Sequence, residues 1–214
     1  MDWSEIVELV RPYHGLQDPD LELPAILGAF GRTKALSFLE IGTYQGGTST
    51  AVALAYPDAE VFTVDLPVPE EAVCNAQSSD LQGIAFKKLC PGWVVQFHMD
   101  SADLCDLSNA PPLLTHMFDM VFVDGDHRVE PTLTDLRNAA KLIRDDGVIL
   151  VHDYTDARGP HPRPHWTVWV HEAVHRFAGE SGFTVQRLAG TDLAAAGSWT
   201  WLALLSPPDR KGER

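Results

Sequence analysis

The apolar residues of the chain follow two different spacings, which predict N-terminal helices followed by alternating strands and helices. Over residues 3–10 and 21–30 they recur three and four positions apart, the spacing of one buried helix face. A turn-rich segment, RPYHGLQDPD, separates the two stretches. We therefore expect residues 1–30 to form an N-terminal helical cap.

From Ala35 onward, short apolar runs predict buried strands between helical segments. The expected strands are residues 35–42, 60–66, 93–100, 119–126, 148–154, 183–190 and 198–206. The expected helices cover residues 47–56, 129–143 and 167–182. Pro57 stops the first of these helices, and Pro131 fits the first turn of the second. This alternation favours right-handed crossovers and a mostly parallel sheet, so the predicted fold class is α/β with a doubly wound sheet.

Acidic residues stand at or just beyond the ends of five predicted strands. They are Glu40, Asp65, Asp100, Asp124 and Asp153. Asp is common at strand ends and helix N-caps, so one such acid would mean little. Because open α/β sheets bind ligands at the carboxyl ends of their strands, five acids at that edge predict a polar ligand site.

A glycine-rich loop, EIGTYQGGT at residues 40–48, joins the first strand to its helix. Gly42 permits a tight turn, and Gly46 permits a positive φ at the start of the helix. The spacing is neither the GxGxxG of dinucleotide sites nor that of a P-loop, and no Lys follows to hold a phosphate. The loop could hold a carboxylate and a ribose, or it could be an ordinary glycine-rich turn.

The charge distribution limits the classes of partner. The 214 residues carry a net charge of -14, and all of this excess lies in residues 1–127, which hold 19 acids and 5 bases. A positive field is needed to bind nucleic acid or anionic membrane, so we expect neither as a partner. Three cysteines without a disulfide pattern, an acidic N-terminus unlike a signal peptide and the lack of a long apolar run predict a cytoplasmic protein.

Taken in order, these motifs resemble the class I S-adenosylmethionine (SAM)-dependent methyltransferases over roughly residues 35–205. FLEIGTYQGGTS resembles the family's first motif, VFTVD ends on its ribose-binding acid, and MDSA resembles its adenine-binding segment. VFVDGDH and VILVHDY resemble its fourth and fifth strand motifs. The resemblance implies strand order 3-2-1-4-5-7-6 with an antiparallel last strand, a SAM-binding domain over residues 31–206 and a polar tail over 207–214. The implied cofactor contacts are Glu40, Gly42, Thr43, Tyr44, Gly46, Asp65, Asp100, Ser101 and Asp124.

A second group of polar residues follows the fourth and fifth strands. Two carboxylates and an imidazole, from Asp124, His152 and Asp153, can hold a divalent metal. Within class I this resembles the metal-dependent O-methyltransferases, including the catechol type and the macrolide sugar type. That resemblance implies that these three residues bind Mg²⁺ or Mn²⁺ and that His127 is the general base.

Two of these assignments leave alternatives open. The family usually has Asp or Glu where this chain has His152, and imidazole is a poor Mg²⁺ ligand. His152 could therefore orient the substrate, the site could prefer Mn²⁺ or Fe²⁺, or it could be metal-free. His127 could instead be a loop or helix-capping residue, because DGDH is itself turn-like.

A competing motif, HEAVH at residues 171–175, matches the HExxH signature of zinc proteases. Its surroundings argue against that function: Ala178 replaces the glycine of the longer metzincin motif, and few downstream acids remain as a third ligand. Two other segments could also have a functional role. Residues 67–92 are long enough for a lid, and the proline-rich segment 159–166 could line a pocket or be a plain connector.

The sequence as a whole predicts a SAM-dependent methyltransferase that methylates a hydroxyl of a small molecule with metal assistance. SAM carries a sulfonium, so the acidic edge suits a cationic cofactor. A homo-oligomer is left open. The alternatives are a SAM-binding regulatory protein without transfer activity and, less favoured, a zinc metalloprotease.

Overall fold

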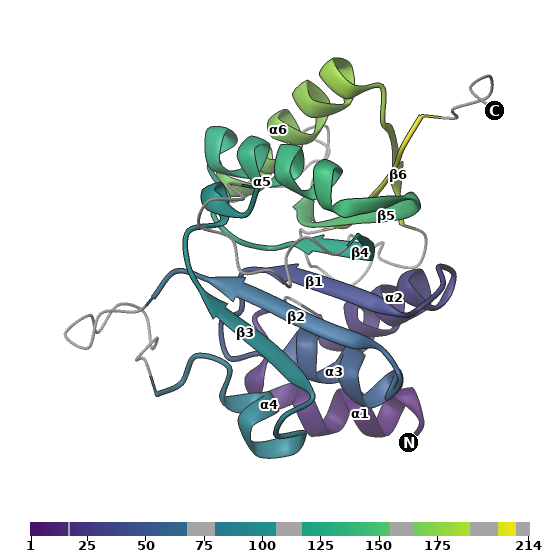
Figure 1. The fold of residues 1–214 in the computed structure, drawn as a ribbon, viewed down its shortest axis with the longest axis vertical. Helices are drawn as coiled ribbons and strands as arrows, with labels where there is room; N and C mark the ends of the chain where they lie inside the picture. Colours follow the sequence, from purple (N-terminus) through teal and green to yellow (C-terminus); the bar gives the residue numbers. More distant parts are fainter. Residues whose placement is uncertain (17, 68–79, 106–116, 155–164, 189–200, 209–214) are drawn as a thin grey trace.

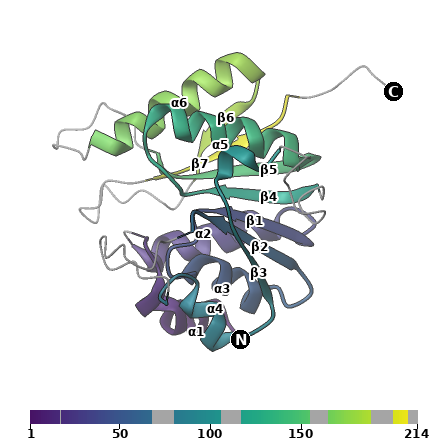
Figure 2. The ribbon, with the colours of Figure 1, turned by 60° about the vertical axis from the view of Figure 1, so that its left-hand side comes forward.

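The computed structural model describes residues 1–16, 18–67, 80–105, 117–154, 165–188 and 201–208. Its centre is a seven-stranded sheet, with helices α1 to α4 on one face and α5 and α6 on the other (Figures 1 and 2). The strands are β1 Ser37–Ile41, β2 Glu60–Asp65, β3 Val94–His98, β4 Phe118–Val123, β5 Ile143–Tyr154, β6 Thr184–Arg187 and β7 Trp201–Ser206. The α/β class predicted from the sequence is confirmed.

The strand order is β3-β2-β1-β4-β5-β7-β6, as predicted. The first five strands of this order pair in parallel, while β7 pairs antiparallel with both β5 and β6. The parallel strands therefore end at one edge of the sheet, and the loops that follow β1, β2, β3, β4 and β5 meet there. This edge carries the predicted site residues.

The helices are α1 Trp3–Val10, α2 Pro19–Gly31, α3 Gly47–Ala55, α4 Ile84–Leu89, α5 Val129–Leu142 and α6 His165–Ser181, with short 3-10 turns η1 Arg11–Tyr13 and η2 Ser101–Asp103. Asp2 caps α1 through a reciprocal pair of hydrogen bonds with Glu5. Helix α2 starts two residues earlier than predicted, because Pro19 lies in its first turn, where the missing amide hydrogen costs nothing. Within the described residues, no helix has both the length and the apolar character needed to cross a membrane.

The apolar core has one cluster on each face of the sheet. The cluster under α5 and α6 includes Leu133 and Phe177. The other joins the N-terminal helices, represented by Ile6 and Phe30, to α3 and to the strand residue Phe122. The predicted N-terminal cap thus shares its core with the SAM-domain segment expected from residue 31 onward.

The structure also corrects the sequence prediction at β5 and in the segment 67–92. Strand β5 begins at Ile143, not at residue 148, because Ile143 pairs with Phe118 before an irregularity in the register. Part of the long segment 67–92 forms α4, which packs against α3. Several predicted stretches lie outside the described residues: 68–79 of that segment, 159–164 of the proline-rich stretch, the strand extensions at 189–190 and 198–200, and the end of the tail at 209–214.

Candidate active site

A cavity of about 610 Å³ opens at the carboxyl edge of the parallel strands. Eight of the nine predicted cofactor contacts line it: Glu40, Gly42, Thr43, Tyr44, Asp65, Asp100, Ser101 and Asp124. The ninth, Gly46, is not among the lining residues and instead forms the N-cap of α3 with φ of 82°. The cap contributes Tyr13 and Gly15 to the same wall. The structure therefore brings the predicted loop and strand-end residues together around one space.

The loop after β1 is fixed by its own backbone. Gly42 has φ of 99°, and a Cβ at this position would lie 2.2 Å from the carbonyl oxygen of Asp124, so only glycine fits. The Oδ2 atom of Asp65 accepts hydrogen bonds from the backbone N–H groups of Thr43 (3.0 Å) and Tyr44 (3.1 Å). Asp65, at the end of β2, thus holds the glycine loop and faces the cavity.

Glu40 is a buried carboxyl beneath this loop. It accepts hydrogen bonds from the hydroxyls of Ser49 and Thr63. Burial, opposed by the Ser49 hydrogen bond and reinforced by the carboxylate of Asp124, raises the pKa of Glu40 to about 8. In the ligand-free protein this side chain is therefore largely neutral at pH 7, and a cation bound nearby would favour its ionised form.

The far end of the cavity is built around the turn after β3. The side chain of Asp100 accepts a hydrogen bond from the backbone N–H of Ala102 (2.9 Å), and Ser101 Oγ donates one to Asp135 Oδ1 (2.6 Å). Asp135, on α5, also lines the cavity but is not among the predicted contacts. Burial raises its pKa to about 7. Its position on the buried stripe of α5, three residues after Thr132 and four before Ala139, was the available sequence signal.

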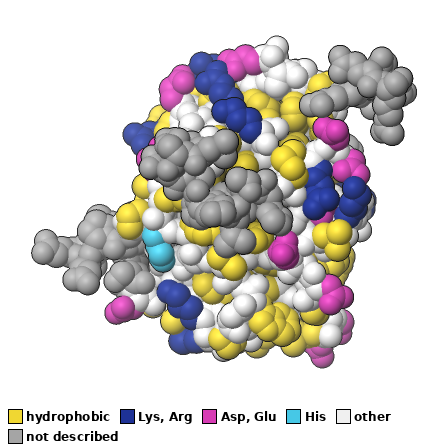
Figure 3. Space-filling model, in the orientation of Figure 1, with side chains coloured by type: hydrophobic (Ala, Val, Ile, Leu, Met, Phe, Trp, Pro, Cys, Tyr) yellow, Lys and Arg dark blue, Asp and Glu magenta, His cyan; other side chains and the backbone are white. Residues whose placement is uncertain are grey.

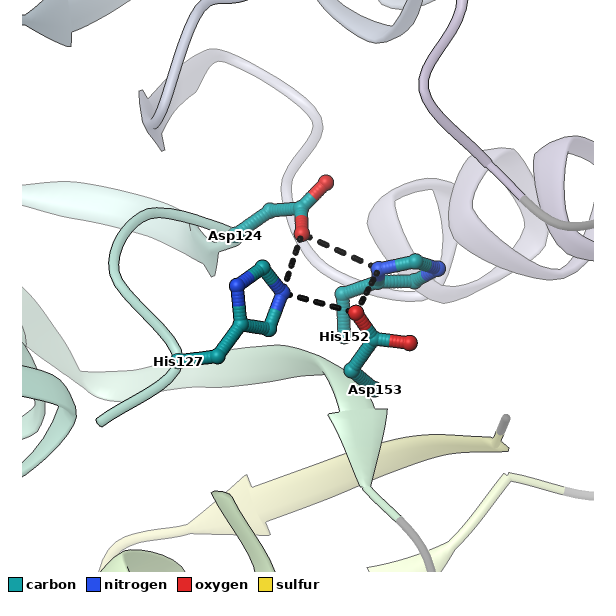
Figure 4. A group of neighbouring side chains, drawn as sticks. All are labelled: Asp124, His127, His152 and Asp153. Atoms are coloured by element: carbon teal, nitrogen blue, oxygen red, sulfur yellow. Dashed lines mark hydrogen bonds and ion pairs between the residues drawn. The ribbon is translucent and has the colours of Figure 1, made fainter. Parts of the chain in front are cut away.

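Four side chains gather beside the cavity, at the ends of β4 and β5 (Figure 4). Asp124, His127, His152 and Asp153 each offer one donor atom within 4.8 Å of the others. Asp153 Oδ2 lies 2.7 Å from His127 Nε2, and Asp124 Oδ1 lies 3.0 Å from His152 Nδ1. Asp153 has φ of 53°, a left-handed conformation that Asp tolerates better than most residues. The structure thus brings the predicted metal ligands and the predicted base into one cluster, which we call the Asp–His cluster.

Charge pairing dominates this cluster. Burial disfavours charge on Asp124, but His152 and His127 outweigh it and lower the pKa of Asp124 to about 2. Burial also disfavours the imidazolium of His127, yet Asp124 and Asp153 raise its pKa to about 9. The same two carboxylates hold the pKa of His152 well above its usual value despite burial. Without another cation, both imidazoles are therefore protonated at neutral pH.

The donor set fits a divalent metal ion. The Oδ1 atom of Asp153 is buried and has no hydrogen-bond partner among the described residues, while Oδ2 of the same carboxylate faces the two imidazoles. Two carboxylates with two imidazoles suit Mn²⁺, Fe²⁺ or Zn²⁺ better than Mg²⁺, which prefers oxygen ligands throughout. Of the two ions that the family resemblance implied, Mg²⁺ and Mn²⁺, the chemistry of the residues thus favours Mn²⁺.

Glu22 is a site residue that the sequence prediction missed. It lies on α2, is fully buried, and places Oε1 3.1 Å from His152 Nε2. The sequence pattern that could have revealed it is an acid within an apolar helix face: Glu22, Ile26 and Phe30 are spaced four residues apart. The cap therefore reaches the Asp–His cluster through a buried carboxyl.

The HExxH segment lies on α6. Tyr154 stacks on His171 and its hydroxyl lies 3.1 Å from His175 Nε2. Glu172 is exposed. Among the described residues, one group brings three or more potential metal ligands together, and it is the Asp–His cluster. His171 and His175 are not part of it. The two histidines pack around an aromatic ring, which does not support a zinc-protease centre.

Basic and acidic side chains lie interspersed on the described face shown in Figure 3. Several are paired, as in Arg137 with Glu180 and Arg176 with Glu130. These pairs join α5 to α6 at the surface, where each contributes little stability.

Fold and site together define a methyltransferase-type α/β domain. The profile of a family described as a methyltransferase domain matches residues 39–154, more than half of the chain, and the chain belongs to this family. The family resemblance drawn from the sequence motifs is thereby confirmed.

Known proteins resemble the chain at modest identity. The uncharacterized protein R132 of Acanthamoeba polyphaga mimivirus is 26% identical over 150 residues, which cover 68% of this chain and 60% of that protein. This chain therefore spans less than two thirds of that relative.

Among solved structures, the O-methyltransferase TomG of Streptomyces achromogenes, in complex with SAM, has a TM-score of 0.61 at 22% identity, covering 96% of this chain and 89% of TomG. An O-methyltransferase of Bacillus cereus with bound SAH has a TM-score of 0.60 at 17% identity, covering 95% and 90%. At these identities the likeness establishes the shared fold.

Proposed function

We propose that this protein transfers the methyl group of SAM to a hydroxyl oxygen of a small molecule, with a divalent metal ion in the Asp–His cluster. The observation that carries the proposal is the position of Asp124. This residue lines the cofactor-sized cavity and also belongs to the four-donor cluster. A cofactor in the cavity and an acceptor at the cluster would therefore lie next to each other.

The cavity residues offer complementary groups for SAM. We infer that Asp65 and the glycine loop face the ribose and the amino acid portion, and that Asp100 and Ser101 face the adenine. The acids around the cavity, including Glu40, suit a ligand with a sulfonium and an ammonium group. The SAM in TomG and the SAH in the Bacillus cereus enzyme support this choice of cofactor.

The transfer itself is a direct displacement. The hydroxyl oxygen forms a bond to the methyl carbon while the carbon–sulfur bond breaks, and the electron pair of that bond stays on sulfur to give SAH. The cluster and cavity contribute mainly by holding the two reactants in line. The hydroxyl proton passes to Nε2 of His127, the nitrogen that faces Asp153 and Asp124.

His127 can accept this proton only when its imidazole is neutral. Its pKa of about 9 in the ligand-free protein means that the two carboxylates alone would keep it protonated at pH 7. A bound divalent cation would compete with protons for the cluster and would lower the pKa of a hydroxyl placed beside it. With a cation held mainly by Asp124 and Asp153, His127 would be free to act as the base.

The test is methyl transfer from radiolabelled SAM to a panel of catechols, phenols and sugar hydroxyls, before and after chelation with EDTA. We expect transfer to at least one acceptor class, loss of activity after chelation, and greater recovery with Mn²⁺ than with Mg²⁺. Activity that persists after full chelation would exclude the metal role. SAM binding by calorimetry without transfer to any acceptor would favour the regulatory alternative.

A further inference from the structure

The contact between Glu22 and His152 joins the N-terminal cap to the Asp–His cluster. Oε1 of Glu22 lies 3.1 Å from His152 Nε2, and both side chains are almost completely buried. The other carboxyl oxygen, Oε2, accepts a hydrogen bond from the backbone N–H of Asp18 at the start of α2 (3.0 Å). The carboxyl group is therefore held at both oxygens, one by its own helix and one by the imidazole.

The opposite side of the His152 ring faces the cluster. Nδ1 lies 3.0 Å from Asp124 Oδ1 and 3.6 Å from Asp153 Oδ2. The ring of Phe122 packs edge-on against the imidazole, with ring centroids 6.2 Å apart. Each ring nitrogen thus has a different environment: Nε2 points to the cap and Nδ1 points to the candidate metal position.

A carboxylate at one ring nitrogen determines what the other nitrogen can do. An ionised carboxylate only accepts hydrogen bonds, so its partner Nε2 must carry a hydrogen. In metal sites, such a partner fixes the tautomer and the orientation of the ring and leaves the other nitrogen to bind the ion. The Glu22–His152 contact has this arrangement, with Nδ1 as the nitrogen that faces the cluster.

We propose that Glu22 is a positioning residue for the active site: it fixes the His152 ring with Nε2–H toward the cap and Nδ1 toward Asp124 and Asp153. The cap is then part of the machinery that sets the cluster geometry. The metal-binding consequence of this assignment rests on the function proposed above. The orientation of the ring does not, and the experiment treats the two separately.

The first measurement is calorimetric titration of Mn²⁺ into wild type, Glu22→Ala and Glu22→Gln, without acceptor. Loss of the carboxylate should weaken Mn²⁺ binding by about 10- to 100-fold, and Glu22→Gln, whose amide oxygen can still accept from Nε2–H, should lose less. SAM affinity should change little, because Glu22 does not line the cavity. An unchanged Mn²⁺ affinity in a folded Glu22→Ala would overturn the proposal.

The matched control is Glu8→Gln, the same substitution at an exposed acid of the same cap. Glu8 pairs with Arg11 at the surface, and its side chain is 71% exposed. This variant should bind Mn²⁺ within about twofold of wild type, as expected for a surface change. A loss equal to that of Glu22→Gln would show a general effect of charge on the cap and would contradict a specific role for Glu22.

The second measurement reads the ring directly by ¹H–¹⁵N NMR of the metal-free protein, with the resonance assigned by its loss in His152→Gln. We expect a protected Nε2–H signal in wild type and Glu22→Gln, and its loss in Glu22→Ala. If wild type binds no Mn²⁺, the metal role fails, and this signal alone decides whether Glu22 orients His152. Absence of the protected signal from wild type would overturn the proposal even if Glu22→Ala does not fold.

Discussion

The cofactor cavity and the Asp–His cluster share Asp124 but satisfy their acids in different ways. In the cavity, Asp65 and Asp100 accept hydrogen bonds from backbone amides, and Glu40 accepts from hydroxyls. None of these donors changes its charge near neutral pH. In the cluster, the partners of the acids are His127 and His152, whose charge does depend on pH and on bound cations.

Because of this difference, the cavity is a preformed site, whereas the charge state of the cluster depends on pH and on bound cations. The backbone fixes the cavity before any ligand arrives, so loss of one acid there should reduce affinity and leave the chemistry beside it intact. The cluster balances its carboxylates with protons or, under the proposed function, with a metal ion, so changes there should alter the rate of transfer more than cofactor binding. The following predictions test that separation.

The largest effect is expected for His127→Ala. If His127 removes the hydroxyl proton, the transfer rate should fall by roughly 10²–10⁴-fold. Single-turnover kinetics with radiolabelled SAM would measure this rate, and calorimetry should show unchanged SAM affinity, because His127 does not line the cavity. A collapse of SAM affinity in this variant would show that the cavity and the cluster are not separable.

A smaller effect, on the other side of the comparison, is expected for Asp65→Ala. Loss of a carboxyl group that accepts backbone hydrogen bonds should weaken SAM binding by roughly 10- to 100-fold, equivalent to about 1.5–3 kcal/mol. Asp65→Asn keeps an acceptor for the loop amides and should retain more affinity. Mn²⁺ binding to the cluster serves as the control, and a parallel loss there would contradict the comparison.

The smallest effect concerns stability and pH at the far end of the cavity. Burial, with the charges of Asp100 and Asp126 adding to it, raises the pKa of Asp135 to about 7, above its ordinary value of 3.8. The folded state therefore holds this proton more tightly than the unfolded state, and the resulting stability is lost as the pH rises from about 4 through 7. Wild type should become less stable over this range relative to Asp135→Asn.

Thermal melts of the apoprotein at pH 5 and pH 8 would check this sign. The Tm of Asp135→Asn minus that of wild type should increase between the two values, by about 2–4 °C for each kcal/mol involved. Asp103→Asn, an exposed acid in the adjacent turn, is the control and should show no such trend. A difference that stays constant between pH 5 and pH 8 would mean that Asp135 is ionised throughout this range.

Much of the fold could be predicted from the sequence because buried parallel strands consist of short runs of apolar residues. Strand order followed from the family resemblance, and the strand-end acids predicted which edge carries the site. The boundary of β5 was missed because Arg144 to Gly147 are polar and typical of a turn, yet the strand includes them because pairing with β4 occurs on both sides, at Ile143 and from Val148 onward. Pairing between strands is a tertiary effect that local pattern does not contain.

The site residues that escaped prediction share one property. Glu22 and Asp135 are acids on otherwise apolar helix faces, and each contacts a side chain far away in the sequence: His152 for Glu22 and Ser101 for Asp135. Helical spacing shows that such an acid is buried, but it does not show which partner stabilises it. The partner depends on how the helix packs against the sheet edge, which only the folded structure provides.

The buried pair of Glu22 and His152 also constrains any attempt to recombine this protein with its relatives. The match to the family begins only at residue 39, so the helices before it could be taken for a segment that can be replaced freely. A chimera that replaced them with a segment lacking an acid at position 22 would leave Nε2 of the buried His152 without its carboxylate partner. Residues 22 and 152 should therefore be exchanged together in a chimera, although 130 residues separate them in the chain.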